Sequence, residues 1–438
     1  MFAATAVAAL VGAVRRADAR DVVLGVVRYA CAWPVLLTLI AMSVAGVGSR
    51  VALGYLSPGA YAEDVLAARS FLAGNELYAA RGGAELETVL AESRVPWTDV
   101  PGITACQANA FANRARFYTE HAHTPMLLLA AVPVVRAGGG QGLYVLIVLL
   151  SLASAGVMAA ILVNWTLVPW GSRESLLALT LVVGWQPVLA GVRQGDAVII
   201  AAGLTAAAWY LARTSGRAGG VAAALAACLA VPAIGAVLAM VRAGGRAAAA
   251  AALAFLAAIA VTVAIAGVSV FPGFLQTISQ STTTYAAATA NYSLAGRMLQ
   301  LGGERALITA IVLLLAFSWW RSRTADMAFA LFLSASLVAA PLVWSQHLAL
   351  LFVPLVLLFC HAVTGGSSLA LAGWAAVALS VSLPDTTVIA FSRTVAVIAG
   401  PVPVAPLGLL VLWTWTMVSS RTLAASAQTA HVAVTVLS

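Results

Sequence analysis

The sequence contains no lysine and few charged residues of either sign. All 23 basic residues of the 438-residue chain are arginine, 15 residues are acidic, and charged residues make up 9% of the total. Soluble globular domains have about 25% charged residues, so this composition excludes an ordinary soluble protein. The net charge of +8 comes from short arginine groups between apolar runs. It indicates membrane topology, and we expect no nucleic acid as a partner.

Cysteine is scarce as well, which limits both disulfides and metal sites. Of the four cysteines, Cys31, Cys228 and Cys360 lie in apolar runs, and Cys106 lies alone in a long polar segment. This arrangement excludes a disulfide framework. The sequence has no Cys-x-x-Cys, no cluster of cysteine and histidine, and no Asp-x-Asp. We therefore expect neither a metal ion nor another cofactor.

Apolar residues are abundant instead. They make up 62% of the chain, and the mean hydropathy is +1.00. The long apolar runs do not alternate with polar residues as barrel strands do, and backbone amides in lipid must be satisfied within the segment, so the runs predict helices. A helix crosses the hydrocarbon core with about 20 residues. We expect an all-α polytopic, multi-pass protein of the cell membrane, a bundle of about 10–12 transmembrane helices.

The chain divides into three expected regions. Residues 1–31 form a cytoplasmic N-terminal segment, because four arginines precede the first strong span, and its apolar run over residues 2–14 forms a short amphipathic or partly inserted helix. Residues 32–422 form the transmembrane domain, and residues 423–438 form a C-terminal tail. Within the transmembrane domain, residues 58–123 are expected as an extracytoplasmic catalytic loop and residues 271–304 as a second polar loop.

The expected spans are apolar runs bounded by polar residues. They cover residues 32–47, open to extension as far as 56, then 125–135, 143–163, 176–192, 197–211, 222–241, 247–270, 307–320, 327–343, 348–363, 369–383 and 406–418. The run 125–135 is short for a crossing and ends near a Gly-Gly-Gly break. The span 222–241 has arginine pairs near both ends. Either it is a pair of half-helices broken near Pro232, or one arginine pair lies outside the cell.

The loop 58–123 gathers the carboxylates. Eight of the 15 acidic residues lie in it, among them Glu63 and Asp64. Apolar residues at helical spacing predict a helix over residues 65–77, lying along the membrane surface with Asp64 at its N-terminal end. The Asp64 carboxylate is either a general base or an acid that stabilises the helix terminus. We favour the base, and we expect Glu63 to be a solvated neighbour.

Further polar groups interrupt the apolar sequence at span ends. They comprise residues 121–125, 193–196, 291–293 with Arg297, and 344–347. Ionisable residues beside or within spans are costly and indicate function. Together with Asp64 they supply a base, arginines that can hold a phosphate, and a histidine that can hydrogen-bond. Glycosyl transfer from a lipid phosphate requires this set.

In order and spacing, these groups resemble the motifs of the GT-C superfamily of integral-membrane glycosyltransferases, and most closely glycosyltransferase family 87. The matching residues are Asp64 with Ala67 to Arg69, Gly74 and Tyr78; His123 and Pro125; Arg193 to Gly195; Asn291 to Gly296; and Trp344 to His347. The resemblance covers residues 35–358. The chain departs from it at Leu229, where many relatives have a lysine.

The resemblance implies a GT-C-type bundle and an inverting hexosyltransferase that takes a sugar, typically mannose, from a polyprenyl phosphate on the outer side of the membrane. The acceptor would be a lipid-linked or cell-envelope glycan. The family's base is a carboxylate in the first extracytoplasmic loop, which is Asp64 here. The expected donor- and substrate-binding residues are Arg69, His123, Arg193, Gln194, Asp196, Asn291, Arg297, Trp344 and His347. With Leu229 in place of the lysine, donor-phosphate binding is left to the arginines.

Two other functions fit parts of the sequence. A transporter or flippase also has polar groups in its spans, but transporters more often show inverted repeats with paired broken helices, and this sequence shows one Pro-broken span and no repeat. A lipid-binding scaffold without activity would fit the change at Leu229, although retention of Asp64 argues against it. Two of the expected donor-binding residues can instead have a purely structural role: Arg193 can extend to lipid headgroups, and His347 can form a hydrogen bond to a neighbouring helix.

Overall fold

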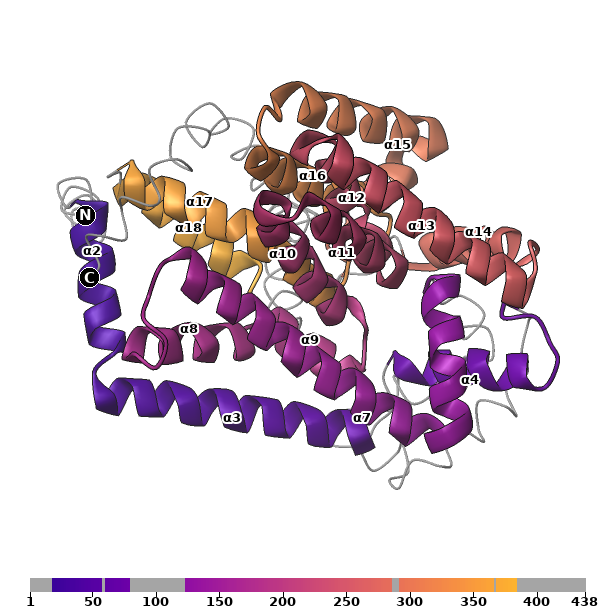
Figure 1. Cartoon of the computed structure of the whole chain (residues 1–438), viewed down its shortest axis with the longest axis horizontal. Helices are drawn as coiled ribbons and strands as arrows, with labels where there is room; N and C mark the ends of the chain where they lie inside the picture. The colour runs from indigo at the N-terminus through magenta and orange to yellow at the C-terminus, as the bar shows by residue number, and fades with distance from the viewer. Residues whose placement is uncertain (1–17, 57–59, 79–122, 286–290, 366–367, 384–438) are drawn as a thin grey trace.

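Helices make up the regular structure of the protein. The computed structural model describes residues 18–56, 60–78, 123–285, 291–365 and 368–383. Over these residues the expected all-α membrane architecture is confirmed (Figure 1). The short helix expected near the N-terminus, most of the loop 58–123, the span 406–418 and the C-terminal tail lie outside the described residues.

Four helices of the described ranges are long and apolar enough to cross a membrane. They are α3 (Trp33–Leu56), α7 (Pro125–Trp165), α13 (Gly245–Ala266) and the continuous segment Ser345–Thr364, which joins η4 (Ser345–Leu351) to α17 (Phe352–Thr364). The bent pair α8 (Arg173–Val183) and α9 (Gln186–Gln194) is a fifth candidate. The outer faces of α3 and α13 expose large apolar side chains such as Met42 and Leu253, as lipid-facing helices do.

Shorter helices complete the bundle. They are α2 (Ala19–Ala30), α4 (Tyr61–Leu72), α10 (Val198–Thr214), α11 (Gly216–Leu229), η3 (Val231–Ala233), α12 (Ile234–Ala243), α14 (Val270–Tyr285), α15 (Leu294–Arg321), α16 (Ala325–Ala339) and α18 (Ser368–Ser380). The segment expected as a second polar loop, residues 271–304, is therefore largely helical. The expected number of 10–12 crossings stays a prediction, because several of these helices are shorter than a full span.

Two of the expected apolar spans contain a bend, and backbone chemistry explains both. The runs 125–135 and 143–163 belong to one continuous segment, α7, which consists of two helical parts joined at a kink: Gly139 (φ 63°, ψ −165°) is non-helical and lies within the expected Gly-Gly-Gly break. Ala131 before the bend packs in the same apolar cluster as Ile147 after it. The run 176–192 is not one helix: α8 and α9 meet at an angle of 50°, and Pro187 lies in the first turn of α9, where a proline starts a helix but cannot continue one.

The span 222–241 adopts the first of its two alternatives, half-helices broken near Pro232. α11 ends at Leu229, the short helix η3 contains Pro232, and α12 follows. A Cβ on Gly216, at the start of α11, would lie 3.5 Å from the Cβ of Ala247, which follows α12 closely in sequence. The start of α11 and the end of α12 therefore lie at one end of the bundle, together with the arginines that flank them.

That end of the bundle is rich in arginine and tryptophan. Arg213, in the last turn of α10, forms an ion pair with Asp326 at the start of α16. Its guanidinium also lies 4.4 Å and 4.5 Å from the ring centroids of Trp165 and Trp209. Arg242, near the end of α12, donates to a backbone carbonyl of α15. We call this the arginine-rich end; the opposite end of α10 begins next to Asp196.

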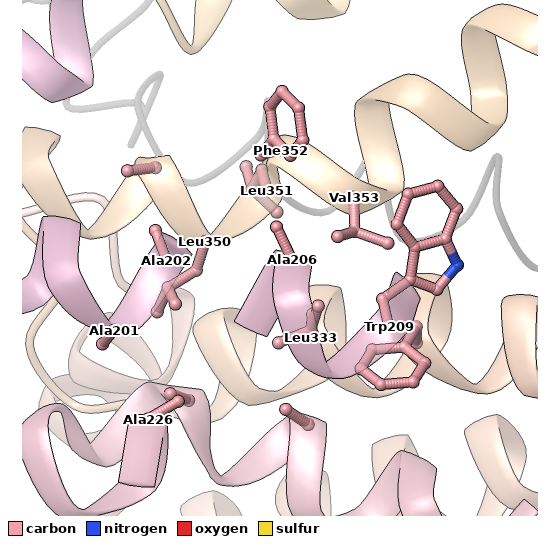
Figure 2. Close-up of a cluster of buried hydrophobic side chains, with 14 of the residues drawn as sticks. Ala201, Ala202, Ala206, Trp209, Ala226, Leu333, Leu350, Leu351, Phe352 and Val353 are labelled. Atoms are coloured by element: carbon pink, nitrogen blue, oxygen red, sulfur yellow. The ribbon is translucent and has the colours of Figure 1, made fainter. Parts of the chain in front are cut away.

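The central core is built on α10 and the segment η4–α17 (Figure 2). Ala201, Ala202 and Ala206 of α10 are fully buried, and their small side chains let Leu350 and Leu351 pack close to the helix axis. Close packing of this kind holds membrane helices together where lipid removes the hydrophobic driving force. The core thereby fixes the start of α10 against η4, and both elements carry polar side chains at that end.

Tyr144 of α7 ties the ends of α3 and α9 together at the same end of the bundle. Its hydroxyl donates to the carbonyl oxygens of Val51 and Val192, each at 3.1 Å. The ring leaves no space for a side chain on Gly195: a Cβ there would lie 2.8 Å from Tyr144 and from Tyr61. Gly195 also has φ 62°, the left-handed conformation that ends α9.

We expect Gly195→Ala to lower the stability of the protein by roughly 1–3 kcal/mol, because the new methyl group meets two rings and the backbone is strained. Thermal unfolding of the purified protein in detergent measures this effect. Gly142→Ala is the matched control, since a Cβ on Gly142 in α7 meets nothing within 4 Å. Equal melting temperatures for the two variants would contradict the close packing at Gly195.

Candidate functional site

Asp64 is buried in the first turn of α4. Its side chain has no exposed surface (0%), although carboxylates are almost never fully buried unless they are paired. The helix begins at Tyr61 with Ala60 as its N-cap and no side-chain capping bond, so Asp64 does not cap the helix. Val65 and Leu66 pack α4 against α7, and this packing brings Asp64 under the start of α7. The Asp64 face of α4 is thus packed into the bundle against α7.

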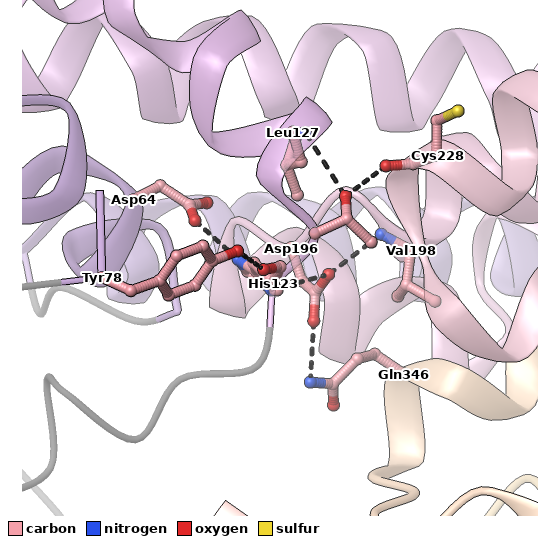
Figure 3. Close-up of polar contacts among 9 residues, drawn as sticks. Asp64, Tyr78, His123, Leu127, Asp196, Val198, Cys228 and Gln346 are labelled. Atoms are coloured by element: carbon pink, nitrogen blue, oxygen red, sulfur yellow. Dashed lines mark hydrogen bonds and ion pairs between the residues drawn. The ribbon is translucent and has the colours of Figure 1, made fainter. Parts of the chain in front are cut away.

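His123 lies directly before α7, where several bonds hold the chain. Thr124 is the N-cap of α7: its hydroxyl accepts from the amide of Leu127 at 3.3 Å and donates to the carbonyl of Cys228. The hydroxyl of Tyr78 donates to the carbonyl oxygen of His123 at 2.5 Å (Figure 3). The backbone at residue 123 is therefore fixed on two sides, and the imidazole points toward Asp64.

Asp196 is the second buried carboxylate of the site, and it is 5% exposed. It follows the left-handed Gly195 in the turn between α9 and α10. Its Oδ1 accepts from the backbone amide of Val198 at 2.9 Å, and its Oδ2 accepts from the side-chain amide of Gln346 at 3.1 Å (Figure 3). The carboxylate is thus held by the start of α10 and by η4.

The imidazole of His123 lies between the two carboxylates. Its Nδ1 lies 2.6 Å from Oδ1 of Asp64, and its Nε2 lies 3.8 Å from Oδ1 of Asp196. Oδ2 of Asp64 is buried and has no hydrogen-bond partner among the described residues. We call Asp64, His123 and Asp196 the charged triad.

The pKa values of the triad reflect burial and mutual attraction. Burial raises the pKa of Asp64, and this effect exceeds the opposite effect of the adjacent His123. Burial alone would lower the pKa of His123, but the two carboxylates raise it to about 9. The pKa of Asp196 is lowered, because His123, His347 and its hydrogen bonds outweigh its burial. With a pKa of about 9, the histidine carries a proton at neutral pH.

His347 borders the triad from η4 and interacts electrostatically with Asp196. Its Nδ1 accepts from the backbone amide of Trp344 at 3.0 Å. A ring nitrogen that accepts carries no proton, so the proton of the neutral imidazole is on Nε2. His347 thus offers one N–H donor next to the triad, and its hydrogen bond to Trp344 is local and does not reach a neighbouring helix.

The other expected site residues are more dispersed. Arg193 is exposed in the last turn of α9, close in sequence to Asp196, and Gln194 follows it, partly buried. Arg69 is partly buried in the last turn of α4, and Trp344 is partly buried at the N-cap of η4. Arg297 lies in α15, but its side chain lies outside the described residues.

Asn291 is fully buried and bonded to backbone. Its Oδ1 accepts from the amides of Ser293 and Val343, each at 3.0 Å, and its Nδ2 donates to the carbonyl of Pro341 at 3.3 Å. These bonds hold the chain that enters α15 against the segment between α16 and η4. In this structure Asn291 acts as a brace for the residues that precede Trp344 and His347.

Two participants were missing from the expected site. Gln346 bonds Asp196, and Tyr78 holds the backbone of His123. Both residues belong to the polar motifs of the sequence, but neither an amide nor a phenol signals its partner from sequence alone. Glu63, expected as solvated, is partly buried. Among the described residues no three His, Cys, Asp or Glu side chains are arranged to hold a metal ion.

The arrangement suits proton removal beside an anion. A buried carboxylate with one bonded oxygen and one available oxygen can accept a proton from a hydroxyl, and the His347 N–H and nearby Arg193 can stabilise negative charge.

A search of curated proteins and a search of solved structures found no match. The model of glycosyltransferase family 87 matches residues 121–345. His123, Arg193, Asp196 and Asn291 lie within that match, and the chain belongs to glycosyltransferase family 87.

Proposed function

We propose that the protein transfers a hexose, with mannose as the proposed sugar, from a polyprenyl-phosphate sugar to a lipid-linked or cell-envelope glycan at the outer face of the cell membrane. Membership of a glycosyltransferase family favours an enzyme over the transporter or scaffold that the sequence alone left open. The observation that carries the mechanism is Asp64, a fully buried carboxylate with Oδ1 on His123 and Oδ2 without a partner among the described residues.

Asp64 acts as the general base in this mechanism. The acceptor hydroxyl gives its proton to Oδ2 of Asp64 as its oxygen forms the bond to the anomeric carbon. The bond between that carbon and the phosphate oxygen breaks, and its electron pair leaves with the polyprenyl phosphate. Burial favours this role, because it raises the pKa of Asp64 and makes the carboxylate a stronger acceptor.

Arg193 and His347 are the proposed partners of the leaving phosphate. Arg193 ends α9 at the turn that carries Asp196, and the Nε2–H of His347 borders the same carboxylate. Leaving-group departure turns a phosphodiester monoanion into a phosphate that carries one more negative charge. Donors placed where this charge develops stabilise the transition state, and a guanidinium can bind two phosphate oxygens at once.

The proposed location of the triad at the outer face of the membrane rests on the two ends of α10. Its 17 residues span about 25 Å at 1.5 Å per residue, and they separate Asp196 from the arginine-rich end around Arg213. Arginine is concentrated on the cytoplasmic side of membrane proteins. The triad is then at the outer face, where a lipid-anchored donor and a glycan acceptor can meet.

We expect Asp64→Asn to reduce transfer by about 10²–10⁴-fold while donor binding is retained, because only proton acceptance is lost. The assay follows label from polyprenyl-phosphate mannose into a membrane lipid extract with purified protein. Glu63→Gln is the matched control on the same helix turn and should be much milder. Wild-type turnover by the asparagine variant would refute the assignment of the base.

The pH dependence of kcat/KM tests the environment of the same carboxylate. Asp64 must be ionised to accept a proton, so activity falls as the pH drops through its pKa. Since burial raises that pKa from the ordinary 3.8, we expect the acidic limb to lie above pH 3.8. An acidic limb at or below this value would contradict Asp64 as the base.

Loss of the phosphate contacts should weaken donor binding. We expect Arg193→Ala and His347→Ala each to cost about 1.5–3 kcal/mol of binding free energy for a polyprenyl-phosphate sugar, the size of a hydrogen bond to a charged group. Arg193→Lys should restore only part of it, because lysine lacks the planar fork. The exposed Arg246, at the start of α13, provides the control Arg246→Ala. Unchanged donor binding in both site variants would contradict the phosphate role.

A further inference from the structure

The mechanism proposed above gives no role to His123 or Asp196. His123 contacts the base Asp64 directly, and Asp196 lies on the other side of His123. We propose that Asp196 is a positioning residue, which holds His123 as an imidazolium against Asp64 while the base accepts its proton. The catalytic part of this inference rests on the proposed function, whereas the charge state of His123 does not.

The geometry of the ring supports an imidazolium. Each ring nitrogen of His123 faces a carboxylate oxygen, at 2.6 Å for Asp64 and 3.8 Å for Asp196. A neutral imidazole has one N–H, and its other nitrogen would then present a lone pair to a carboxylate. Only the protonated ring presents an N–H to both sides.

Asp196 is built as a fixed countercharge. The left-handed Gly195 turns the chain into position, the amide of Val198 binds one carboxylate oxygen, and Gln346 binds the other. Because Gly195 packs against Tyr144 and Tyr61, the turn itself has little room to move. These contacts keep the negative charge on the far side of His123 from Asp64.

Among the described residues, groups on three elements act electrostatically on His123. They are Asp64 on α4, Asp196 in the turn between α9 and α10, and His347 on η4. His347 accepts a hydrogen bond at Nδ1, which leaves it neutral. The two carboxylates therefore dominate, and the pKa of His123 rises to about 9.

Countercharge matters during the reaction because the triad changes its total charge. With His123 protonated, two carboxylates and one imidazolium sum to a single negative charge, and proton acceptance by Asp64 makes the triad neutral. Without the charge of Asp196, the same step would leave an uncompensated cation in a buried site. Burying an unpaired charge is costly. In an Asp196→Asn variant, either Asp64 would accept the proton from the hydroxyl less readily, or His123 would lose its own proton and become neutral.

The direct test is chemical modification of His123 as a function of pH in the full-length protein. Diethyl pyrocarbonate acylates neutral imidazole, and peptide mass spectrometry reads the extent at His123 after short pulses. In the wild type we expect little reaction until the pH approaches about 9. In Asp196→Asn the midpoint should fall by about 1–3 pH units, the effect of one close opposite charge. Asp196→Glu should retain the wild-type midpoint, and Asp21→Asn, an exposed carboxylate on α2, is the control.

A wild-type midpoint near the ordinary histidine value of 6.5, or equal midpoints for wild type and Asp196→Asn, would overturn the inference. The wild-type result stands even if the asparagine variant does not fold. The activity assay adds a second readout: the basic limb of kcat/KM should move to lower pH in Asp196→Asn and stay in place in Asp196→Glu. Since modification requires no turnover, absence of transferase activity would count against the proposed function and leave this test intact.

Discussion

The burial of two carboxylates around one imidazole is the constraint on which the site end of the bundle depends. Removing such charges from water costs several kcal/mol per ion unless each is paired and hydrogen-bonded. Asp64, His123 and Asp196 meet this condition only if α4, the start of α7 and the turn before α10 arrive at one point. Helix ends meet there, because free backbone amides such as that of Val198 can bind a carboxylate. The cap at Thr124 and the phenol of Tyr144 secure these ends.

The same charge distribution limits where an anionic donor can lie. In the proposed mechanism the ionised triad carries a net negative charge and repels a phosphate group, so the phosphate does not take the place of the hydroxyl that donates its proton to Asp64. Arg193 is exposed in the last turn of α9, and His347 lies on η4, whose Gln346 bonds Asp196. The proposed base and the residues proposed to bind the phosphate thus come from different elements, α4 for Asp64 and α9 and η4 for the other two. Separation of this kind suits a displacement in which the nucleophile and the leaving group occupy opposite sides of one carbon.

Sequence reasoning reached the fold class and the family but not the connections inside the site. The apolar runs predicted helices, because lipid leaves the backbone few alternatives. Polar residues at span ends identified Asp64, His123, Asp196 and His347, since their burial must be offset. The contacts between them join residues as far apart as Asp196 and Gln346, and no local pattern encodes such a distance. The break between α8 and α9 and the helix over residues 270–285 also escaped prediction, because neither proline nor a polar tract alone decides between a bend, a loop and a helix.

The bend of α7 at Gly139 has a consequence for how the chain threads the bilayer. A hydropathy count over the two apolar runs of this helix gives two passages through the membrane. Only the part after Gly139, residues 140–165 or about 39 Å, exceeds the ~30 Å of hydrocarbon, and the part before it folds against the same cluster. By length, α7 therefore counts as one candidate span and not two. Each span added or removed inverts the compartment assigned to every later loop, so the way in which the two parts of α7 are counted changes the side predicted for the remainder of the chain.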